Sequence, residues 1–339
     1  MSKYTGGFVT NTEVIPAGKF TNSVASGVWS IQEALMYTKA DIYPNPDNVN
    51  AVGLFFGGTD SSGNRLNHIQ KVTIASAGNT TDFGDSSVGF KEGNALGSAT
   101  RAVYHIGLNG DSGAVVNTME FVEFSTAGNG TDFGDLGVTK SERLASSNAT
   151  LGLFAGSANS SVVNNIDQIN IASAGNSTDF GDQSLARGRG GNTINSTTKG
   201  CFAGGRLASG KTNTIDFVNF SSEGNATDFG NLLGNTEGSG GASSSTVGLI
   251  AQGGGANVIE RIVIASAGNS TDFGDLTVSS TRIGGVCSKT IAAFAVANNT
   301  NTIDQVNIAS AGNATDFGNL VATTGDATAT ASNAHGGIG

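Results

Sequence analysis

The residues whose spacing could serve chemistry are acidic, and they recur along the chain. The pattern Gly-Asn-x-Thr-Asp-Phe-Gly, followed by Asp or Asn, occurs six times, with its Asp-Phe pairs at Asp82, Phe83, Asp132, Phe133, Asp179, Phe180, Asp228, Phe229, Asp272, Phe273, Asp316 and Phe317. Repeated carboxylate and amide oxygens are ligands that Ca²⁺ accepts. Asn231 and Asn319 replace the second Asp in two copies. Since an amide keeps the acceptor oxygen without the charge, hydrogen-bonded turns are the preferred interpretation, with calcium as the alternative.

Other reactive side chains are few and scattered. The three histidines, His68, His105 and His335, show no zinc-like spacing. Cys201 and Cys287 fall at different repeat positions, so free thiols are expected. Asp-Phe-Gly is also the Mg²⁺-binding tripeptide of protein kinases, but it occurs here without the other kinase motifs. No acid, base and nucleophile set converges, so we expect no enzyme activity, no metal and no cofactor.

The elements that position these motifs repeat with them. The motif phenylalanines are 50, 47, 49, 44 and 44 residues apart, and an apolar stretch begins 14 residues before each of them. A Gly-rich stretch precedes that one, and the segment between the two varies in length. Constant spacings indicate paired strands, whereas insertions indicate a surface loop. Self-similarity at this period is typical of repeat proteins.

Each repeat reads as four short strands. In the third copy they are expected over residues 143–148, 150–156, 166–173 and 178–185. Four antiparallel strands in 44 to 50 residues form one blade of a β-propeller, so we predict an all-β, six-bladed propeller. The motif Phe would be buried between blades, Gly175-Asn176 would form a tight turn with positive φ, and Asp179 would brace nearby amides.

The repeat resembles known families. Its apolar strand, polar turn, aromatic residue and Leu are similar to a kelch repeat, and Gly57-Gly58, Gly204-Gly205 and Gly253-Gly254 match the kelch double glycine. The motifs lack the kelch Trp, and the second, third and sixth copies lack the glycine pair. The Gly-Asn-x-Thr-Asp-Phe-Gly-Asp-Leu form more closely resembles repeats in tail-fibre and other virion proteins of aquatic bacteriophages. This resemblance covers residues 51–339 and implies a virion structural protein.

Residues 1–50 stand outside the repeat. They contain all three prolines, the only Trp and three of the four Tyr. Ser30-Ile-Gln-Glu33 has the form of a capping box, which predicts a short helix over Ile31–Lys39 in a mostly irregular arm. The segment Ser26–Glu33, with Trp29 and Glu33, also resembles a segment near repeats of phage tail proteins. We therefore expect an attachment or oligomerisation arm; simple packing under the first blade is the alternative.

The end of the chain predicts how the ring closes. The first repeat lacks a strand before Ala51, and the last residues begin a seventh repeat that does not develop. Residues 328–333 would supply the missing first strand of blade one and close the ring. Residues 51–339 are therefore expected to form one propeller domain, preceded by the arm of residues 1–50.

Charge and motifs together limit the function. A net charge of −10 argues against nucleic-acid binding. No signal sequence or membrane-spanning run is visible, so membrane insertion is not expected. Arg187–Gly191 is expected as a solvated loop, with an anion or glycan contact as the alternative.

The leading hypothesis is a virion tail fibre or tail-associated propeller that contacts the host surface. The arm would bind other virion proteins, and the chain would form a homo-oligomer in the particle. A capsid-decorating protein without a receptor role is one alternative. A glycan-binding lectin is another, with its pockets in the variable loops at residues 59–67, 109–117, 157–164 and 206–212.

Overall fold

The computed structural model describes residues 20–21, 24–25, 51–159, 161–297, 300–324 and 329–338. The chain divides into two units, Met1–Val49 and Asn50–Gly339. In the first unit, β1 (Phe20–Thr21) and β2 (Val24–Ala25) form an antiparallel pair. The helix expected over Ile31–Lys39 and the arm residues Trp29 and Glu33 lie outside the described residues.

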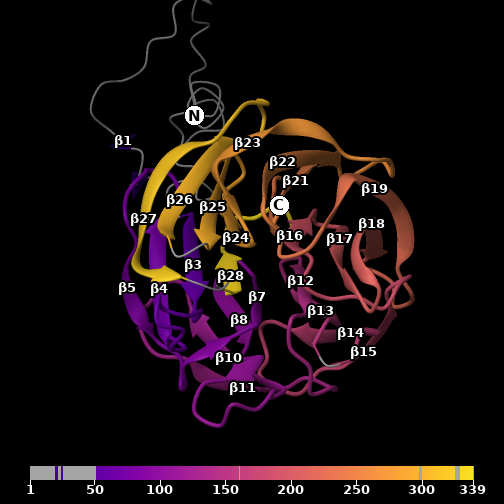
Figure 1. Cartoon of the computed structure of the whole chain (residues 1–339). Coiled ribbons are helices and arrows are strands. Elements are labelled where there is room, and N and C mark those ends of the chain that lie inside the picture. Colours follow the sequence, from indigo (N-terminus) through magenta and orange to yellow (C-terminus); the bar gives the residue numbers. More distant parts are fainter. Residues whose placement is uncertain are drawn as a thin grey trace, which may run out of the picture. The chain divides into compact units, whose positions relative to one another are not determined.

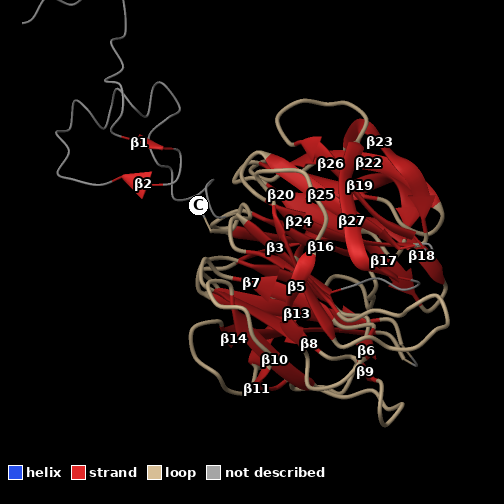
Figure 2. Ribbon diagram, turned by 90° about the vertical axis from the view of Figure 1, so that its left-hand side faces the viewer, coloured by secondary structure: helices blue, strands red, loops and turns tan. Residues whose placement is uncertain are grey.

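The second unit is a six-bladed β-propeller, as predicted, and its described residues contain no helix (Figures 1 and 2). Each blade is a four-stranded antiparallel sheet. From the inner to the outer strand, the first blade contains β28 (Ala329–Ser332), β3 (Val52–Phe56), β4 (His68–Thr73) and β5 (Thr81–Asp85), and the second contains β7 (Asn94–Gly97), β8 (Arg101–His105), β10 (Thr118–Glu123) and β11 (Thr131–Asp135). The third blade contains β12 (Leu144–Ser147), β13 (Leu151–Ser157), β14 (Val163–Asn170) and β15 (Thr178–Asp182), and the fourth contains β16 (Gly191–Asn195), β17 (Lys199–Leu207), β18 (Gly210–Asn219) and β19 (Thr227–Thr236). The fifth blade contains β20 (Gly240–Ser243), β21 (Val247–Ala251), β22 (Ala256–Val263) and β23 (Thr271–Ser280), and the sixth contains β24 (Arg282–Cys287), β25 (Ile291–Ala297), β26 (Thr300–Asn307) and β27 (Thr315–Thr324). A short extra pair, β6 (Phe90–Lys91) and β9 (Leu108–Asn109), accompanies the second blade.

The first blade takes its inner strand from the far end of the chain. β28 pairs with β3 in the register Ala329↔Phe56 to Ser332↔Gly53. The adjoining Asn333 accepts a hydrogen bond from the Val52 N–H at 2.7 Å. Figure 1 shows the C-terminal end near the centre of the ring.

The core consists of six apolar clusters between neighbouring blades. Each cluster combines side chains of two successive blades and includes one motif phenylalanine, from Phe83 between blades one and two to Phe317 between blades six and one. These phenylalanines are at most 3% exposed. Burial of such a side chain stabilises a fold by about 1.5–3 kcal/mol. The blades are therefore held together at their outer strands as well as near the axis.

A β-bulge lies at the same place in every blade. The register between the third and outer strands shifts after the first apolar residue of the third strand, for example between Ile166 and Asp167. Opposite the bulge stands the motif glycine, whose φ lies between +130° and +153° in all six copies. L-residues rarely adopt this conformation, which explains why the motif uses glycine there.

Candidate functional site

The motif aspartates and phenylalanines lie on opposite sides of the outer strands. All six phenylalanines are buried, whereas Asp82, Asp132, Asp179, Asp228, Asp272 and Asp316 are exposed. The prediction that Asp179 braces nearby amides is wrong, because this side chain is exposed and the hydrogen bonds at the junction come from other groups of the motif.

The Gly-Asn dipeptide of each motif contacts the preceding blade. At all six junctions the Asn Oδ1 accepts the backbone N–H of the second residue after the neighbouring Phe, at 3.0–3.1 Å. The residue after the Asn donates its N–H to the carbonyl of that same residue, at 2.7–3.0 Å. At five junctions the Gly N–H also donates to the Phe carbonyl. We call this set of contacts the rim latch.

The expectation that the Asn of this turn has a positive φ is wrong. None of the motif asparagines has a positive φ, since Glu92, Glu142 and Arg189 are the non-glycine residues with positive φ in the described part of the chain. The Asn is therefore required for its side-chain oxygen and not for a left-handed backbone. The glycine directly after the motif Phe permits the close approach of two blades, because a Cβ at that glycine would overlap with the Gly-Asn backbone of the next blade in every copy.

A second polar contact lies deeper in each junction and was not predicted. The residue after the first apolar position of the third strand is buried in all six blades, namely Gln70, Glu120, Asp167, Asp216, Glu260 and Asp304. At five junctions its side-chain oxygen accepts a backbone N–H of the preceding blade's outer segment, at 2.7–3.3 Å. The available signal was an acid directly after a buried apolar residue in five of six copies.

Two of these buried acids pair with arginines. Arg143 Nη1 lies 2.6 Å from Asp167, and Arg187 Nη1 lies 2.9 Å from Asp216, with both side chains of the second pair 0% exposed. Burial lowers the pKa of both guanidinium groups, and the adjacent carboxylates oppose that shift. The expectation of a solvated Arg187–Gly191 loop is therefore wrong at Arg187, whose Nη2 also donates to the Phe202 carbonyl.

The variable loops lie at one end of the propeller, which we call the loop face. They join the second and third strands, and because every blade has the same antiparallel order, all of them emerge at the same end. In the fourth blade the expected loop 206–212 is largely strand, with a short turn between β17 and β18. The inner strands begin at the loop face, as the pairing Leu144↔Ala155 shows.

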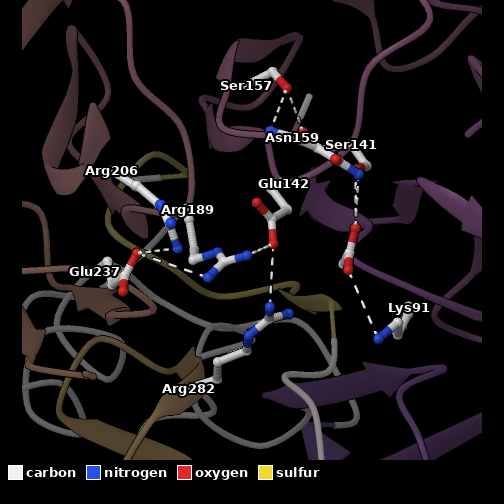
Figure 3. Close-up of polar contacts among 10 residues, drawn as sticks. Lys91, Ser141, Glu142, Ser157, Asn159, Arg189, Arg206, Glu237 and Arg282 are labelled. Atoms are coloured by element: carbon white, nitrogen blue, oxygen red, sulfur yellow. Dashed lines mark hydrogen bonds and ion pairs between the residues drawn. The ribbon is translucent and has the colours of Figure 1, made fainter. Parts of the chain in front are cut away.

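A charged cluster occupies the loop face around the start of the inner strands. It consists of Glu142, Arg189, Arg206, Glu237 and Arg282, which are joined by ion pairs (Figure 3), and Glu92 lines the same cavity. Figure 3 shows the Glu142 carboxylate between Arg189 and Arg282, the latter at 3.1 Å and separated from it by 140 residues. Arg189 and Arg206 each lie 3.7 Å from Glu237.

The backbone beneath the charged cluster forms its own hydrogen-bonded arc. The N–H of Glu142, Arg189, Gly238 and Ile283 each donates to a carbonyl of the preceding blade at 2.7–2.9 Å. Glu92, Glu142 and Arg189 have φ of 61°, 57° and 56°. Non-glycine residues in this conformation cost of order 1–3 kcal/mol each. Three such residues at one rim mark it as a candidate site.

The chemistry of the charged cluster is that of shared ion pairs. Two carboxylates, Glu142 and Glu237, face three guanidinium groups, and the adjoining cavity has a volume of about 40 Å³. That volume holds one or two water molecules. Arg189 Nε and Glu237 Oε2 are buried without a hydrogen-bond partner, which suits such a water. The ion pairs therefore join the starts of the inner strands of different blades, since Glu142, Arg189 and Arg282 come from three different blades.

The C-terminal residues lie at the opposite end of the propeller, which we call the plug face. His335 is 1% exposed, and its Nε2 lies 2.8 Å from the Gly97 carbonyl while its Nδ1 lies 3.1 Å from Asn195 Oδ1. Gly336 donates its N–H to Ser243 at 2.8 Å. Residues 333–338, which we call the plug, thus contact the inner strands of blades two, four and five. Its sequence shows no pattern that would have predicted this position.

Acid should destabilise the plug through His335. Burial lowers the pKa of His335 to about 4 and that of His105 to about 3. Between pH 6.5 and these values the unfolded chain binds protons that the folded chain excludes, so the free energy of unfolding falls as pH falls, by up to about 1.4 kcal/mol per pH unit for each histidine. Denaturant unfolding from pH 7 to 4.5 should show a shallower pH slope for His335→Gln. His68→Gln, which replaces a half-exposed histidine of the first blade, serves as the comparison variant.

The remaining reactive residues are buried or solitary. Cys201 and Cys287 are free and buried, and burial raises the pKa of their thiols to about 12 and about 11. In the described part of the chain no three His, Cys, Asp or Glu side chains meet as a metal ion would need. Likewise, no helix among the described residues is long and apolar enough to span a bilayer.

Comparison with models of known protein families and with curated protein sequences found no match for this chain. The repeated geometry of the molecule is therefore the basis for its functional interpretation.

Proposed function

We propose that this protein is a structural component of a bacteriophage virion, a tail fibre or tail-associated propeller whose loop face contacts the host surface. The observation that carries the proposal is that each repeat combines a constant junction between blades with a loop of variable length. The rim latch has the same geometry at every junction, whereas the inserted residues fall on one face. A rigid disc with one variable face suits recognition of a changing surface.

The placement in a virion is supported by the resemblance of the repeats to phage virion proteins and by the nonrepetitive residues 1–50. In this proposal that arm binds other virion proteins, and the chain assembles as a homo-oligomer in the particle. Ala51 begins the propeller at the plug face, because Val52 bonds to Asn333 there. Attachment through this end would leave the loop face open to a host glycan or receptor.

Ring closure by the C-terminal strand is the structural part of the proposal. The pairing of β28 with β3 would fix the first blade to the last, and the plug would join the inner strands of the blades that it contacts. In this proposal the disc is rigid because the first and last strands of the propeller pair within one blade.

Replacement of the longest variable loops tests recognition. Exchanging residues 59–67 and 109–117 for the short Leu207–Gly210 turn of the fourth blade should weaken binding to host glycans on an array by at least about tenfold. These loops also carry structural contacts, because the Asn67 carbonyl accepts the Ser86 N–H at 2.8 Å and Val116 packs against the core between the first two blades. Thermal unfolding is therefore measured on the same variant, and the loss of binding counts only if the variant still unfolds cooperatively. Retained binding after both exchanges would contradict recognition through the loop face.

A capsid-decorating role is the second candidate, and exposed apolar side chains favour it. Leu233, Val278 and Val321 are 60%, 40% and 66% exposed on the long outer strands β19, β23 and β27. A strand whose outer edge has no strand partner among the described residues, and which carries exposed apolar side chains, suits contact with a neighbouring subunit. Particles that keep full adsorption to host cells when this chain is removed would favour decoration over host recognition.

A further inference from the structure

Two hollows of matching composition lie on the third and sixth blades. We call them the amide pockets. The first is lined by Leu151, Gln168, Asn170, Asn176 and Thr178, and the second by Ile291, Gln305, Asn307, Asn313 and Thr315. Each residue of the first occupies the same repeat position as its counterpart in the second. Their volumes are about 310 and 400 Å³, in the range of small-ligand sites of about 300–1,000 Å³.

Strand register places these side chains together. In the sixth blade Ile291 pairs with Asn307, and Gln305 pairs with Thr315. The third blade has the same two pairs, Leu151↔Asn170 and Gln168↔Thr178. Cross-strand partners lie on one face of a sheet, so the four residues form a platform. The Gly-Asn turn that follows the third strand forms the wall at the plug face.

The same platform is occupied by the protein's own side chains in two other blades. In the second blade Arg101 lies over the Phe121 ring at 4.2 Å, and in the fourth Lys199 lies over Phe217 at 4.7 Å. Phe121 and Phe217 occupy the position of Gln168 and Gln305. Arg101 and Lys199 occupy the position of Leu151 and Ile291. The third and sixth blades therefore differ from the second and fourth, because they carry a glutamine in place of the aromatic ring and an aliphatic residue in place of the cation, which leaves the space above the sheet open.

The polar groups of the larger pocket are oriented for an external partner. Asn307 Oδ1 accepts the Ala309 N–H at 2.9 Å, and Asn313 Oδ1 accepts the Asp275 N–H at 3.1 Å. Both amides are thereby fixed, with their Nδ2 groups left to donate elsewhere. The side-chain amide of Gln305 has no hydrogen-bond partner among the described residues, and the residue is half-buried.

The smaller pocket has one difference. Gln168 Nε2 donates to the Asp179 carbonyl at 3.2 Å and to Glu223 of the next blade. In the first blade Ala77 occupies the position of Glu223, so Gln305 has no such neighbour. The amide of the third blade is thus already engaged, while that of the sixth is open.

The chemistry of the lining specifies the class of ligand. Both linings lack charged side chains and combine amide and hydroxyl groups with one aliphatic side chain, Leu151 in the third blade and Ile291 in the sixth. Hydroxyl groups of a sugar ring both donate and accept, and its C–H face packs on aliphatic carbon. We propose that the two amide pockets bind neutral sugar residues, the sixth blade more tightly than the third. These sites lie on the blades towards the plug face, and the proposal does not depend on the loop face or on a virion location.

Calorimetric titration of the full-length protein tests the proposal. The probes are glucose, galactose, mannose and N-acetylglucosamine, each measured separately. We expect at least one of them to bind at two sites per chain. Gln305→Phe should weaken the tighter site by at least about tenfold, and Gln168→Phe should remove the weaker one. Glu223→Ala should strengthen binding in the third blade by releasing Gln168.

The controls come from the chain itself. Phenylalanine is the native residue at this position in the second and fourth blades, so both variants should unfold at the temperature of the unmodified protein. Lys71→Arg, at the same position of the first blade, should leave both sites intact. Absence of binding by all four sugars, or unchanged binding in the Gln168→Phe/Gln305→Phe double variant, would overturn the proposal.

Discussion

Deletion of residues 329–339 should lower the free energy of unfolding by about 4 kcal/mol or more, a loss that few single changes reach. The deletion removes β28, whose four residues are all buried, and leaves the edge of β3 unpaired. It also removes the Ser332 Oγ that accepts the Cys287 N–H at 3.2 Å. Each lost hydrogen bond contributes about 1 kcal/mol, and an open buried strand edge promotes association.

Thermal unfolding followed by circular dichroism, with size-exclusion chromatography, measures both effects. A shorter deletion of residues 333–339 serves as the control, since it keeps β28 and removes only the plug. It should cause a smaller loss and leave the protein monodisperse. A protein lacking residues 329–339 that unfolds like the full chain would show that the C-terminal strand does not close the ring.

Gly318→Ala should destabilise the junction between the sixth and first blades by about 3–5 kcal/mol. Gly318 has a φ of +148°, and a Cβ there would overlap with the Gly78 carbonyl. A strained backbone costs of order 1–3 kcal/mol, and overpacking adds about 1–3 kcal/mol. The same change would separate the Asn79 side chain from the Asn319 N–H, now 3.0 Å apart.

Gly78→Ala is the matched control on the other side of the same contact. A Cβ added at Gly78 would meet no atom within 4 Å, and Gly78 has no positive φ. Its replacement should change the free energy of unfolding by less than about 0.5 kcal/mol. Equal stabilities of the two variants in urea unfolding would contradict the role assigned to the motif glycine.

The blade architecture was predictable because its signals are local and repeated. Spacing from the apolar stretch to the motif Phe is constant, and each strand of the third repeat begins and ends within three residues of its expected bounds. Burial of Phe180 between blades follows from being the one large apolar residue in a polar turn. A pattern repeated six times therefore predicts the propeller fold without any comparison to other proteins.

The polar contacts were harder to predict because their partners lie in different blades. Asn176 looks like a turn residue in its own repeat, and its function depends on a backbone N–H 41 residues earlier. The charged cluster is less visible still, since Glu142 and Arg189 occupy equivalent positions with opposite charges. His335 belongs to no repeat, and its contacts depend on where the ring places the end of the chain.

Cryo-electron microscopy of the particle that carries this polypeptide tests the central claim most directly. We expect a six-bladed ring at the tail, with residues 1–50 bound to a neighbouring virion protein and the loop face directed outward. A ring on the capsid shell, a loop face buried against another subunit, or particles without this chain would contradict it.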